Sequence, residues 1–447
     1  MRGGTQVGYR RVVRISVIGC GYLGAVHAAS MAKLGHDVIG VDVDSGKVAA
    51  LSAGTAPFFE PGLPEILAEA GATGRLRFTT DMAEVAGADV HFIAVGTPQG
   101  EGGAADLRFV DAAVGALADH VGPGQLIVGK STVPVGTAAR LAAQLARVEP
   151  EATLVWNPEF LREGFAVQDT IAPDRLVYGV PAGAAGERAV AVLDSVYATA
   201  IGSGTPRLVV DYATAELVKV SANAFLATKI SFINAMAEIA EVTGADVTAL
   251  ADAIGLDARI GRRFLNAGLG FGGGCLPKDI RAFRARSQEL GLPHTLDFLD
   301  DVDAINLRRR DRVVELVTEL LGGDVTGRRV AVLGLAFKPD SDDVRDSPAL
   351  DIAARLNADG ARVVAFDPEA VETSRRIHPG MAYAASAEEA LRGADIVLVL
   401  TEWRAFRDLD PAAVASLVAG RVIVDGRNCL DRVAWRAAGF EYRGMGR

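Results

Sequence analysis

The segment FGGGCLPKD, residues 271–279, places a single cysteine between a run of glycines and a proline. Pro277 suits the first turn of a helix, where its missing N–H is no loss and its fixed φ fits. A helix that starts there puts Cys275 beside a partly positive N-terminus, which lowers the pKa of a thiol and raises its thiolate fraction. With Lys278 close by, the pattern predicts a nucleophile; the alternative is a buried structural thiol in a glycine-rich turn.

The other cysteines and the histidines predict no further site. Cys20 is interpreted as a helix–strand packing residue and Cys429 as incidental. The three cysteines lie far apart, which gives no disulfide framework and favours a reducing compartment, so we expect a cytoplasmic protein. No pair of the six histidines has the spacing of a zinc motif, and no metal is expected.

A second motif, GCGYLG at residues 19–24, follows an apolar strand pattern and opens a helix pattern, and Asp42 ends the next strand. This is the Rossmann arrangement, in which the glycines allow a tight turn and the approach of a pyrophosphate to a helix N-terminus. An acid at this position bonds the adenosine ribose and repels a 2′-phosphate, so NAD is favoured over NADP. A flavin, or a glycine triplet that serves only the turn, is the alternative. The expected cofactor contacts are Gly19, Gly21, Tyr22, Leu23, Gly24, Asp42, Lys47, Thr97, Thr132 and Lys278.

The elements that must position these motifs follow from periodicity. Strand and helix patterns alternate over residues 12–213, long helices fill 214–322, and the alternation returns over 323–447. We therefore expect an α/β protein with two Rossmann-like, doubly wound parallel-sheet domains, joined by a helical central region. Residues 1–11 are an N-terminal extension. The apolar run after Arg14 is interrupted by the fingerprint glycines, which argues against a signal peptide.

Composition limits the kind of ligand. The 447 residues carry a net charge of −10, which argues against broad contact with nucleic acid or an anionic membrane surface. No stretch approaches the roughly 18 uninterrupted apolar residues of a membrane span. We expect a small-molecule substrate, and a phosphorylated one would need a locally basic pocket.

Segments along nearly the whole chain resemble the nucleotide-sugar 6-dehydrogenases of the UDP-glucose/GDP-mannose dehydrogenase family. They include GCGYLG, FFEPGLPEIL, AVGTPQGEGGAADL, GKSTVPVGT, NPEFLREG, APDRLVYG, RIGRRFLNAGLGFGGGCLPKD, GLAFKPDSDDVRDSP and DGRN, in the expected order. The resemblance implies NAD-dependent, two-step oxidation of UDP-glucose at C6 to UDP-glucuronate. The alternatives are another nucleotide sugar, such as GDP-mannose or a UDP-N-acetyl-hexosamine, and a catalytically silent NAD-binding regulator.

The resemblance also implies catalytic roles. The motif cysteine attacks the intermediate aldehyde to give a thiohemiacetal, and the second oxidation makes a thioester that water hydrolyses. Lys219 and Asp279 flank the reacting centre, and Lys219 with Asn223 stabilises the developing oxyanion. Thr132 and Glu159 match residues that place the hydrolytic water. The alternatives are a solvated lysine, a polar helix position, and turn or cap residues.

For the sugar nucleotide, the resemblance points to loops in both halves of the chain. Lys338 and Arg427 would supply the positive charge that a diphosphate needs. The expected substrate contacts are Glu159, Phe160, Leu161, Lys219, Asn223, Arg259, Phe264, Phe271, Gly272, Gly273, Phe337, Lys338 and Arg427.

Four further features follow from the same resemblance. Glu163 and Arg345 match positions that contact NAD, and Arg259 matches a residue that reaches the ligand of a neighbouring subunit. The family commonly has serine where this chain has Gly274, which removes a hydroxyl from the loop. The central helices resemble the family's dimer core, so we expect a homodimer or a higher homo-oligomer.

Overall fold

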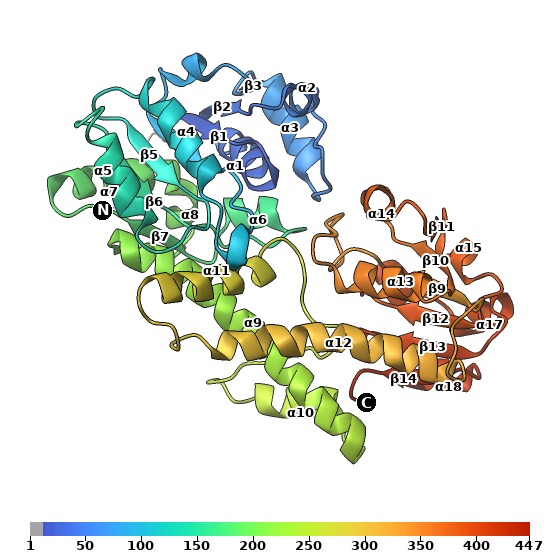
Figure 1. Cartoon of the computed structure of the whole chain (residues 1–447). Helices are drawn as coiled ribbons and strands as arrows, with labels where there is room; N and C mark the ends of the chain where they lie inside the picture. The colour runs from blue at the N-terminus through green and yellow to red at the C-terminus, as the bar shows by residue number, and fades with distance from the viewer. Residues whose placement is uncertain (1–11) are drawn as a thin grey trace, which may run out of the picture. The chain divides into compact units, whose positions relative to one another are not determined.

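The computed structural model describes residues 12–447; the extension expected at residues 1–11 lies outside them. The chain divides into two compact units, Met1–Ser221 and Ala222–Arg447, and the boundary falls inside helix α9 (Tyr212–Thr243) (Figure 1). Each unit is built around its own parallel sheet. The predicted fold class is confirmed: two sheets of Rossmann type are separated in sequence by long helices.

An eight-stranded sheet, in the order β3-β2-β1-β4-β5-β6-β7-β8, forms the centre of the first unit. The chain winds outward from β1 in both directions, so the strand order reverses between β1 and β4. Neighbouring strands are parallel except β6 and β7, which pair antiparallel through Trp156 and Gly179. The strands are β1 (Arg14–Ile18), β2 (Asp37–Val41), β3 (Leu76–Thr79), β4 (Val90–Ile93), β5 (Leu126–Gly129), β6 (Thr153–Trp156), β7 (Leu176–Gly179) and β8 (Arg207–Val210).

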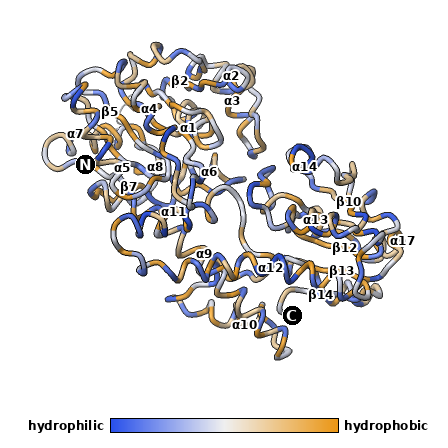
Figure 2. Tube along the Cα trace, in the orientation of Figure 1, coloured by the Kyte–Doolittle hydropathy of each residue, from blue (hydrophilic) through white to orange (hydrophobic). Residues whose placement is uncertain are grey.

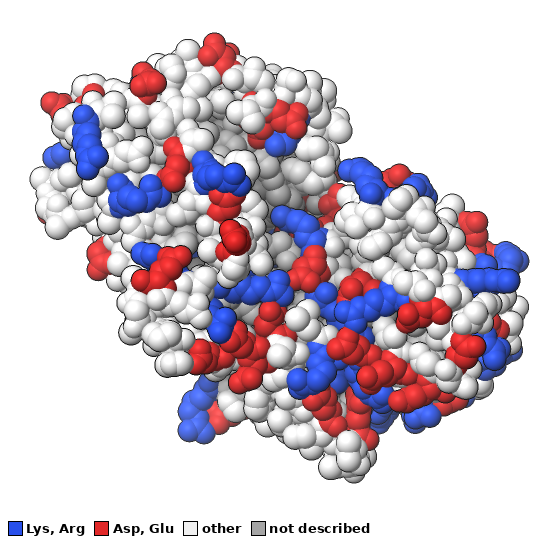
Figure 3. Space-filling model, viewed as in Figure 1, with Lys and Arg blue, Asp and Glu red and all other residues white. Residues whose placement is uncertain are grey.

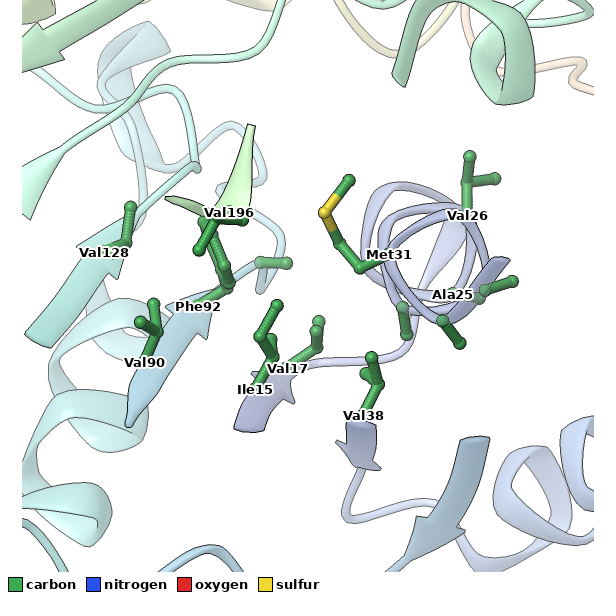
Figure 4. Close-up of a cluster of buried hydrophobic side chains, with 14 of the residues drawn as sticks. Ile15, Val17, Ala25, Val26, Met31, Val38, Val90, Phe92, Val128 and Val196 are labelled. Atoms are coloured by element: carbon green, nitrogen blue, oxygen red, sulfur yellow. The ribbon is translucent and has the colours of Figure 1, made fainter. Parts of the chain in front are cut away.

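Helices cover the two faces of this sheet, which explains why its central strands are apolar on both sides. In β4 and β5 every residue is buried, as expected of parallel strands between two helical layers. Figure 4 shows part of the resulting core, with side chains contributed by β1, β2, β4, β5 and α1. The helices are α1 (Tyr22–Lys33), α2 (Ser45–Ser52), α3 (Leu63–Ala72), α4 (Arg108–Ala118), α5 (Thr137–Leu145), α6 (Ala166–Ile171), α7 (Ala184–Val196) and α8 (Ala198–Gly202).

The second unit repeats the same winding around a six-stranded sheet. Its order is β11-β10-β9-β12-β13-β14, and every neighbouring pair is parallel. The strands are β9 (Arg329–Leu333), β10 (Arg362–Phe366), β11 (Ala382–Tyr383), β12 (Ile396–Val399), β13 (Val422–Asp425) and β14 (Glu441–Gly444). The helices are α13 (Pro348–Ala358), α14 (Val371–Ile377), α15 (Ala387–Leu391), α16 (Arg404–Arg407), α17 (Pro411–Leu417) and α18 (Arg432–Ala437).

The helical middle consists of α9, α10 (Val247–Gly255), α11 (Leu276–Glu289) and α12 (Phe298–Leu320). Hydrophilic and hydrophobic residues alternate along these helices, whereas the strands of both sheets are mainly hydrophobic (Figure 2). On the face shown in Figure 3, basic and acidic side chains are interspersed. Within residues 12–447, no helix combines the length and apolarity that crossing a bilayer requires.

Candidate active site

The fingerprint turn has the geometry that its glycines predict. Gly19 has φ +89°, and a Cβ there would lie 2.7 Å from the side chain of Val95. A Cβ on Gly24 would lie 1.8 Å from the carbonyl oxygen of Gly19, so only glycine allows this approach of helix and turn. A Cβ on Gly21 would meet nothing within 4 Å, and no side chain caps the N-terminus of α1 there. The turn therefore leaves space and backbone N–H groups for an anionic ligand.

Asp42 closes the turn from the end of β2. Its carboxylate accepts a hydrogen bond from the backbone N–H of Cys20 at 2.8 Å and forms an ion pair with Lys47 at 3.1 Å. Cys20 itself is fully buried, and burial raises the pKa of its thiol to about 12, which agrees with a packing role. The fingerprint, Asp42 and Lys47 thus lie together and fit a dinucleotide that offers a pyrophosphate and a ribose.

Further predicted cofactor and catalytic residues follow the next strands of the same sheet. Thr97 comes after β4, Thr132 after β5 and Glu159 after β6, and these three strands are parallel neighbours. Because the carboxyl ends of parallel strands share one edge, these residues lie along the edge that carries the fingerprint turn.

Lys219 and Glu159 are brought together at this edge. The Nζ atom of Lys219 lies 3.0 Å from Oε1 of Glu159, and their side chains are only 7% and 13% exposed. The backbone N–H of Leu161 donates to the second carboxylate oxygen at 2.6 Å, and the ring of Phe160 lies 5.6 Å from the ammonium. A buried lysine in an ion pair is not a solvated surface residue, so that alternative for Lys219 is wrong.

Glu60, which our sequence analysis did not single out, joins three segments around the turn. It is 3% exposed and accepts hydrogen bonds from the backbone N–H groups of Gly164 and Ala166, each at 2.7 Å, and from the hydroxyl of Tyr22. Burial, together with the Glu60 carboxylate, raises the pKa of the Tyr22 phenol. Glu60 thereby fixes the loop that carries Glu163 against the first residue of α1. The signal was the motif FFEPGL, where an acid follows two aromatic residues.

In the second unit, Cys275 is the N-cap residue of α11, which begins at Leu276, one residue earlier than predicted from Pro277. The side chain of Cys275 is exposed, and its backbone carbonyl accepts a hydrogen bond from the N–H of Asp279 at 3.0 Å. No side chain caps this helix N-terminus, so its partial positive charge acts next to the sulfur.

Asn223 is hydrogen-bonded to Asp279, which lies in the first turn of α11. Asp279 is 2% exposed, and its carboxylate accepts a hydrogen bond from the Asn223 amide at 2.6 Å and one from Lys278 at 2.5 Å. The donors to this carboxylate are thus one amide and one ammonium. Lys278, expected to contact the cofactor, is here the partner of Asp279.

The glycine loop before Cys275 packs too tightly for side chains. Gly273 has φ +84°, and a Cβ there would lie 2.8 Å from the ring of Phe337. A Cβ on Gly274 would lie 2.4 Å from the guanidinium carbon of Arg345. Glycine at position 274, where the resemblance led us to expect serine, thus leaves room for Arg345 against the loop.

Two buried polar residues of α12 hold this loop, and neither was predicted. Asn306 clamps Phe271, accepting its N–H at 2.6 Å and donating to its carbonyl at 3.0 Å. Arg309 donates to the carbonyl of Gly268 at 3.2 Å, and both side chains are fully buried. The available signal was that they occupy the apolar stripe of a helix pattern.

The predicted sugar-nucleotide residues of the second unit differ in surroundings. Phe264 is 40% exposed and has φ +65°, an uncommon conformation for an aromatic residue. Arg259 is exposed and bonds Asp257, and Lys338 lies over the ring of Phe337. Arg427 donates to three backbone carbonyls, those of Gly270, Phe337 and Leu400, so its guanidinium orients the protein's own loops.

The two sheets, the glycine turn and the acid at the end of β2 define the class: this is a dinucleotide-binding protein of the doubly wound α/β type. The exposed thiol at a helix N-terminus adds a group suited to covalent chemistry.

Three family models match the chain along its length. They are the NAD binding domain of the UDP-glucose/GDP-mannose dehydrogenase family at residues 13–201, its central domain at 213–308 and its UDP binding domain at 331–432. The chain belongs to this family. It is an NAD-dependent oxidoreductase with a UDP-binding domain, which confirms the predicted family and cofactor.

Relatives of known activity match nearly the whole chain. A UDP-glucose 6-dehydrogenase of Rhizobium meliloti is 43% identical over 97% of this chain and 100% of its own length. The structure of a UDP-glucose dehydrogenase from Pyrobaculum islandicum has a TM-score of 0.88 and 40% identity, covering 99% of this chain and 100% of that chain. The structure of a UDP-D-ManNAc dehydrogenase from Pyrococcus horikoshii has a TM-score of 0.83 and 26% identity, covering 97% and 99%.

Proposed function

We propose that this protein oxidises UDP-glucose at C6 to UDP-glucuronate in two NAD-dependent steps, through a thiohemiacetal and a thioester on Cys275. The observation that carries the proposal is the exposed Cys275 side chain at the uncapped N-terminus of α11. A helix N-terminus favours the thiolate, which is the strongest nucleophile among side chains near neutral pH. The higher identity to UDP-glucose dehydrogenases than to the UDP-D-ManNAc dehydrogenase supports the choice of sugar.

When bound, NAD would supply the hydride acceptor for each oxidation, and the fingerprint turn with Asp42 and Lys47 would hold its pyrophosphate and ribose. Glu163 and Arg345 are further proposed cofactor contacts. The space beside Gly21 and the uncapped helix end are what such a ligand needs.

In the first oxidation the chain must take the proton of the C6 hydroxyl as the carbon loses its hydride. We assign this work to Asp279 acting through an ordered water, with Lys219 and Asn223 stabilising the alkoxide as charge develops. Asp279 and Asn223 share a hydrogen bond of 2.6 Å, and Lys219 pairs with Glu159 at 3.0 Å.

In the second oxidation the thiolate of Cys275 adds to the aldehyde carbon, and the carbonyl oxygen becomes an oxyanion. Loss of the remaining hydride from that carbon leaves a thioester. Water, placed by Thr132 and Glu159, then attacks the thioester, the C–S bond breaks, and the uronate and the thiol are released. Cys275 is therefore needed only after the aldehyde has formed.

We further propose a role for each of the three segments of the chain and an assembly of two copies. Residues 12–213 would serve the cofactor, 323–447 the UDP group, with Lys338 and Arg427 near the diphosphate. The helices of residues 214–322 would join two copies, because α9 exposes Phe225, Phe232 and Ile239 at seven-residue intervals. A reduced thiol also fits a cytoplasmic enzyme.

The test offers UDP-glucose, GDP-mannose and UDP-N-acetyl-hexosamines with NAD and counts both NADH and uronate. UDP-glucose should turn over fastest, with two NADH per uronate. Faster turnover of another sugar would overturn the substrate, and one NADH per product would overturn the double oxidation. NAD binding without turnover of any of these sugars would indicate a regulator.

A further inference from the structure

Glu216, near the start of α9, is a buried carboxylate that the proposed mechanism does not use. It is 1% exposed, and its two oxygens accept hydrogen bonds from the backbone N–H groups of Gly136 and Ala138, each at 2.7 Å. These N–H groups belong to the N-terminus of α5, where they have no partner within the helix. Since Gly136 is the N-cap residue and has no side chain, α5 is capped from α9 instead.

The loop between β5 and α5 carries Thr132, and it is anchored on both sides of that residue. Before Thr132, the hydroxyl of Ser131 donates to the carbonyl of Val95, directly after β4, at 2.7 Å. After Thr132, the N–H of Gly136 is bound by Glu216. The place of Thr132 therefore depends on α9 as well as on the strands of the sheet.

The first turns of α9 are held to the sheet by contacts that do not involve Glu216. The hydroxyl of Tyr212 donates to the carbonyl of Leu154, on β6, at 2.7 Å. A Cβ on Gly179, on β7, would lie 2.6 Å from the Cβ of Ala215, so helix and strand are in close contact there. Loss of the Glu216 carboxylate would thus release α5 and its loop while α9 keeps its place.

The same helix carries Lys219, three residues after Glu216. Lys219 pairs with Glu159 at 3.0 Å, and this contact is direct. Glu216 thereby links the loop of Thr132 to the helix whose lysine holds Glu159. Hydrogen bonds from backbone N–H groups to a carboxylate are shorter and stronger than those between neutral groups, which suits such a joint.

We propose that Glu216 is a positioning residue for thioester hydrolysis, because it fixes the loop of Thr132 relative to Lys219 and Glu159. The inference rests on the proposed function, in which Thr132 and Glu159 place the hydrolytic water. In that step the water oxygen bonds to the acyl carbon and the C–S bond breaks. The products are the uronate carboxylate, the thiol of Cys275 and one proton released to solvent. Oxyanion stabilisation during the oxidations needs Lys219, which stays in place, so hydrolysis is the step that loss of Glu216 slows.

The test compares formation and hydrolysis of the acyl-enzyme in the full-length protein, with UDP-glucose and NAD saturating. Rapid mixing records the burst of NADH, and intact-protein mass spectrometry of acid-quenched samples follows the acyl adduct on Cys275. In Glu216→Ala the burst rate should stay within about twofold of the wild-type rate, whereas hydrolysis of the adduct should slow about 10- to 100-fold. Glu216→Gln keeps one acceptor oxygen and nearly the same volume. It should slow hydrolysis less, and its two rates decide the question where Glu216→Ala does not fold.

Asp211→Ala is the matched control, because it weakens the same end of α9 without breaking the link to α5. The Asp211 carboxylate accepts the N–H of Thr214 at 2.7 Å, within the first turn of the helix. Both rates should match those of the wild type. Equally slow hydrolysis in Asp211→Ala would show that any weakening of α9 is sufficient, and would overturn the specific role of Glu216.

A purely structural role for Glu216 would lower both rates by the same factor, or lower only the stability of the protein; either result overturns the proposal. Hydrolysis at the wild-type rate in a folded Glu216 variant does the same and leaves the proposed function standing. A wild type that forms neither an acyl adduct on Cys275 nor uronate overturns the proposed function itself.

Discussion

The two sheets are wound in the same way, but the aspartate that follows the second strand has different surroundings in each. In each, an aspartate at the end of the second strand accepts hydrogen bonds from the loop after the first strand. Asp42 accepts from the N–H of Cys20 at 2.8 Å, and Asp367 accepts from those of Leu335 at 2.7 Å and Ala336 at 3.1 Å.

Their surroundings separate the two aspartates. Asp42 faces Lys47 and a turn whose Gly21 has open space beside it. Asp367 is 1% exposed and is closed in by the indole N–H of Trp403 at 3.1 Å and the backbone N–H of Ala370 at 2.9 Å. One winding therefore makes a ligand site in the first sheet and a sealed structural joint in the second, so strand order alone does not make a dinucleotide site.

The largest expected effect concerns the reactive thiol of the second unit. Cys275→Ser should lower uronate formation by about 10³-fold or more, because a hydroxyl at this site does not form the acyl intermediate. The measurement is product analysis with UDP-glucose and NAD. Cys429→Ser is the control, since burial raises the pKa of that thiol and keeps it unreactive; normal uronate yield in Cys275→Ser would refute covalent catalysis.

The second effect tests the sealed aspartate. Asp367→Asn replaces a carboxylate that accepts five hydrogen bonds by an amide that must turn an N–H toward buried donors. It should cost about 2–4 kcal/mol of unfolding free energy, measured by denaturant titration. The affinity for NAD should not change; a selective loss of NAD binding would show that this joint also serves a ligand.

The smallest effect is expected from the matched change in the first sheet. Asp42→Asn can still accept the N–H of Cys20, so stability should change little. The KM for NAD should rise about tenfold, and discrimination against NADP should weaken, because the charge next to the ribose is lost. A stability loss as large as that of Asp367→Asn would remove the distinction between the two sheets.

The sequence predicted the elements with strong periodic signals. The central strands β1, β2, β4 to β6, β9, β10, β12 and β13 all fall within predicted apolar runs. Strands β3, β8, β11 and β14 were not predicted; they are partly exposed, so burial gives them no clear pattern. Strand β7 was also missed, although every one of its residues is buried. The site motifs could be predicted as well, because a glycine turn and a helix that starts near a proline each depend on only a few consecutive residues.

What escaped prediction depends on contacts between distant residues. Nothing in the sequence indicated that Lys130 is buried, because its hydrogen-bond partners Asn157 and Tyr197 lie 27 and 67 residues away along the chain. Asn306 holds Phe271 across 35 residues.

By itself the sequence determined the turn at Gly19, the helix start after Cys275 and the winding of both sheets, because steric limits and hydrophobic periodicity act over a few residues. Only the tertiary structure decided that space remains beside the turn at Asp42, whereas Trp403 covers Asp367. It also decided that the ammonium of Lys219 lies buried next to Glu159. Desolvation and hydrogen-bond satisfaction depend on everything packed around a group, so neither can be worked out from its neighbours in sequence.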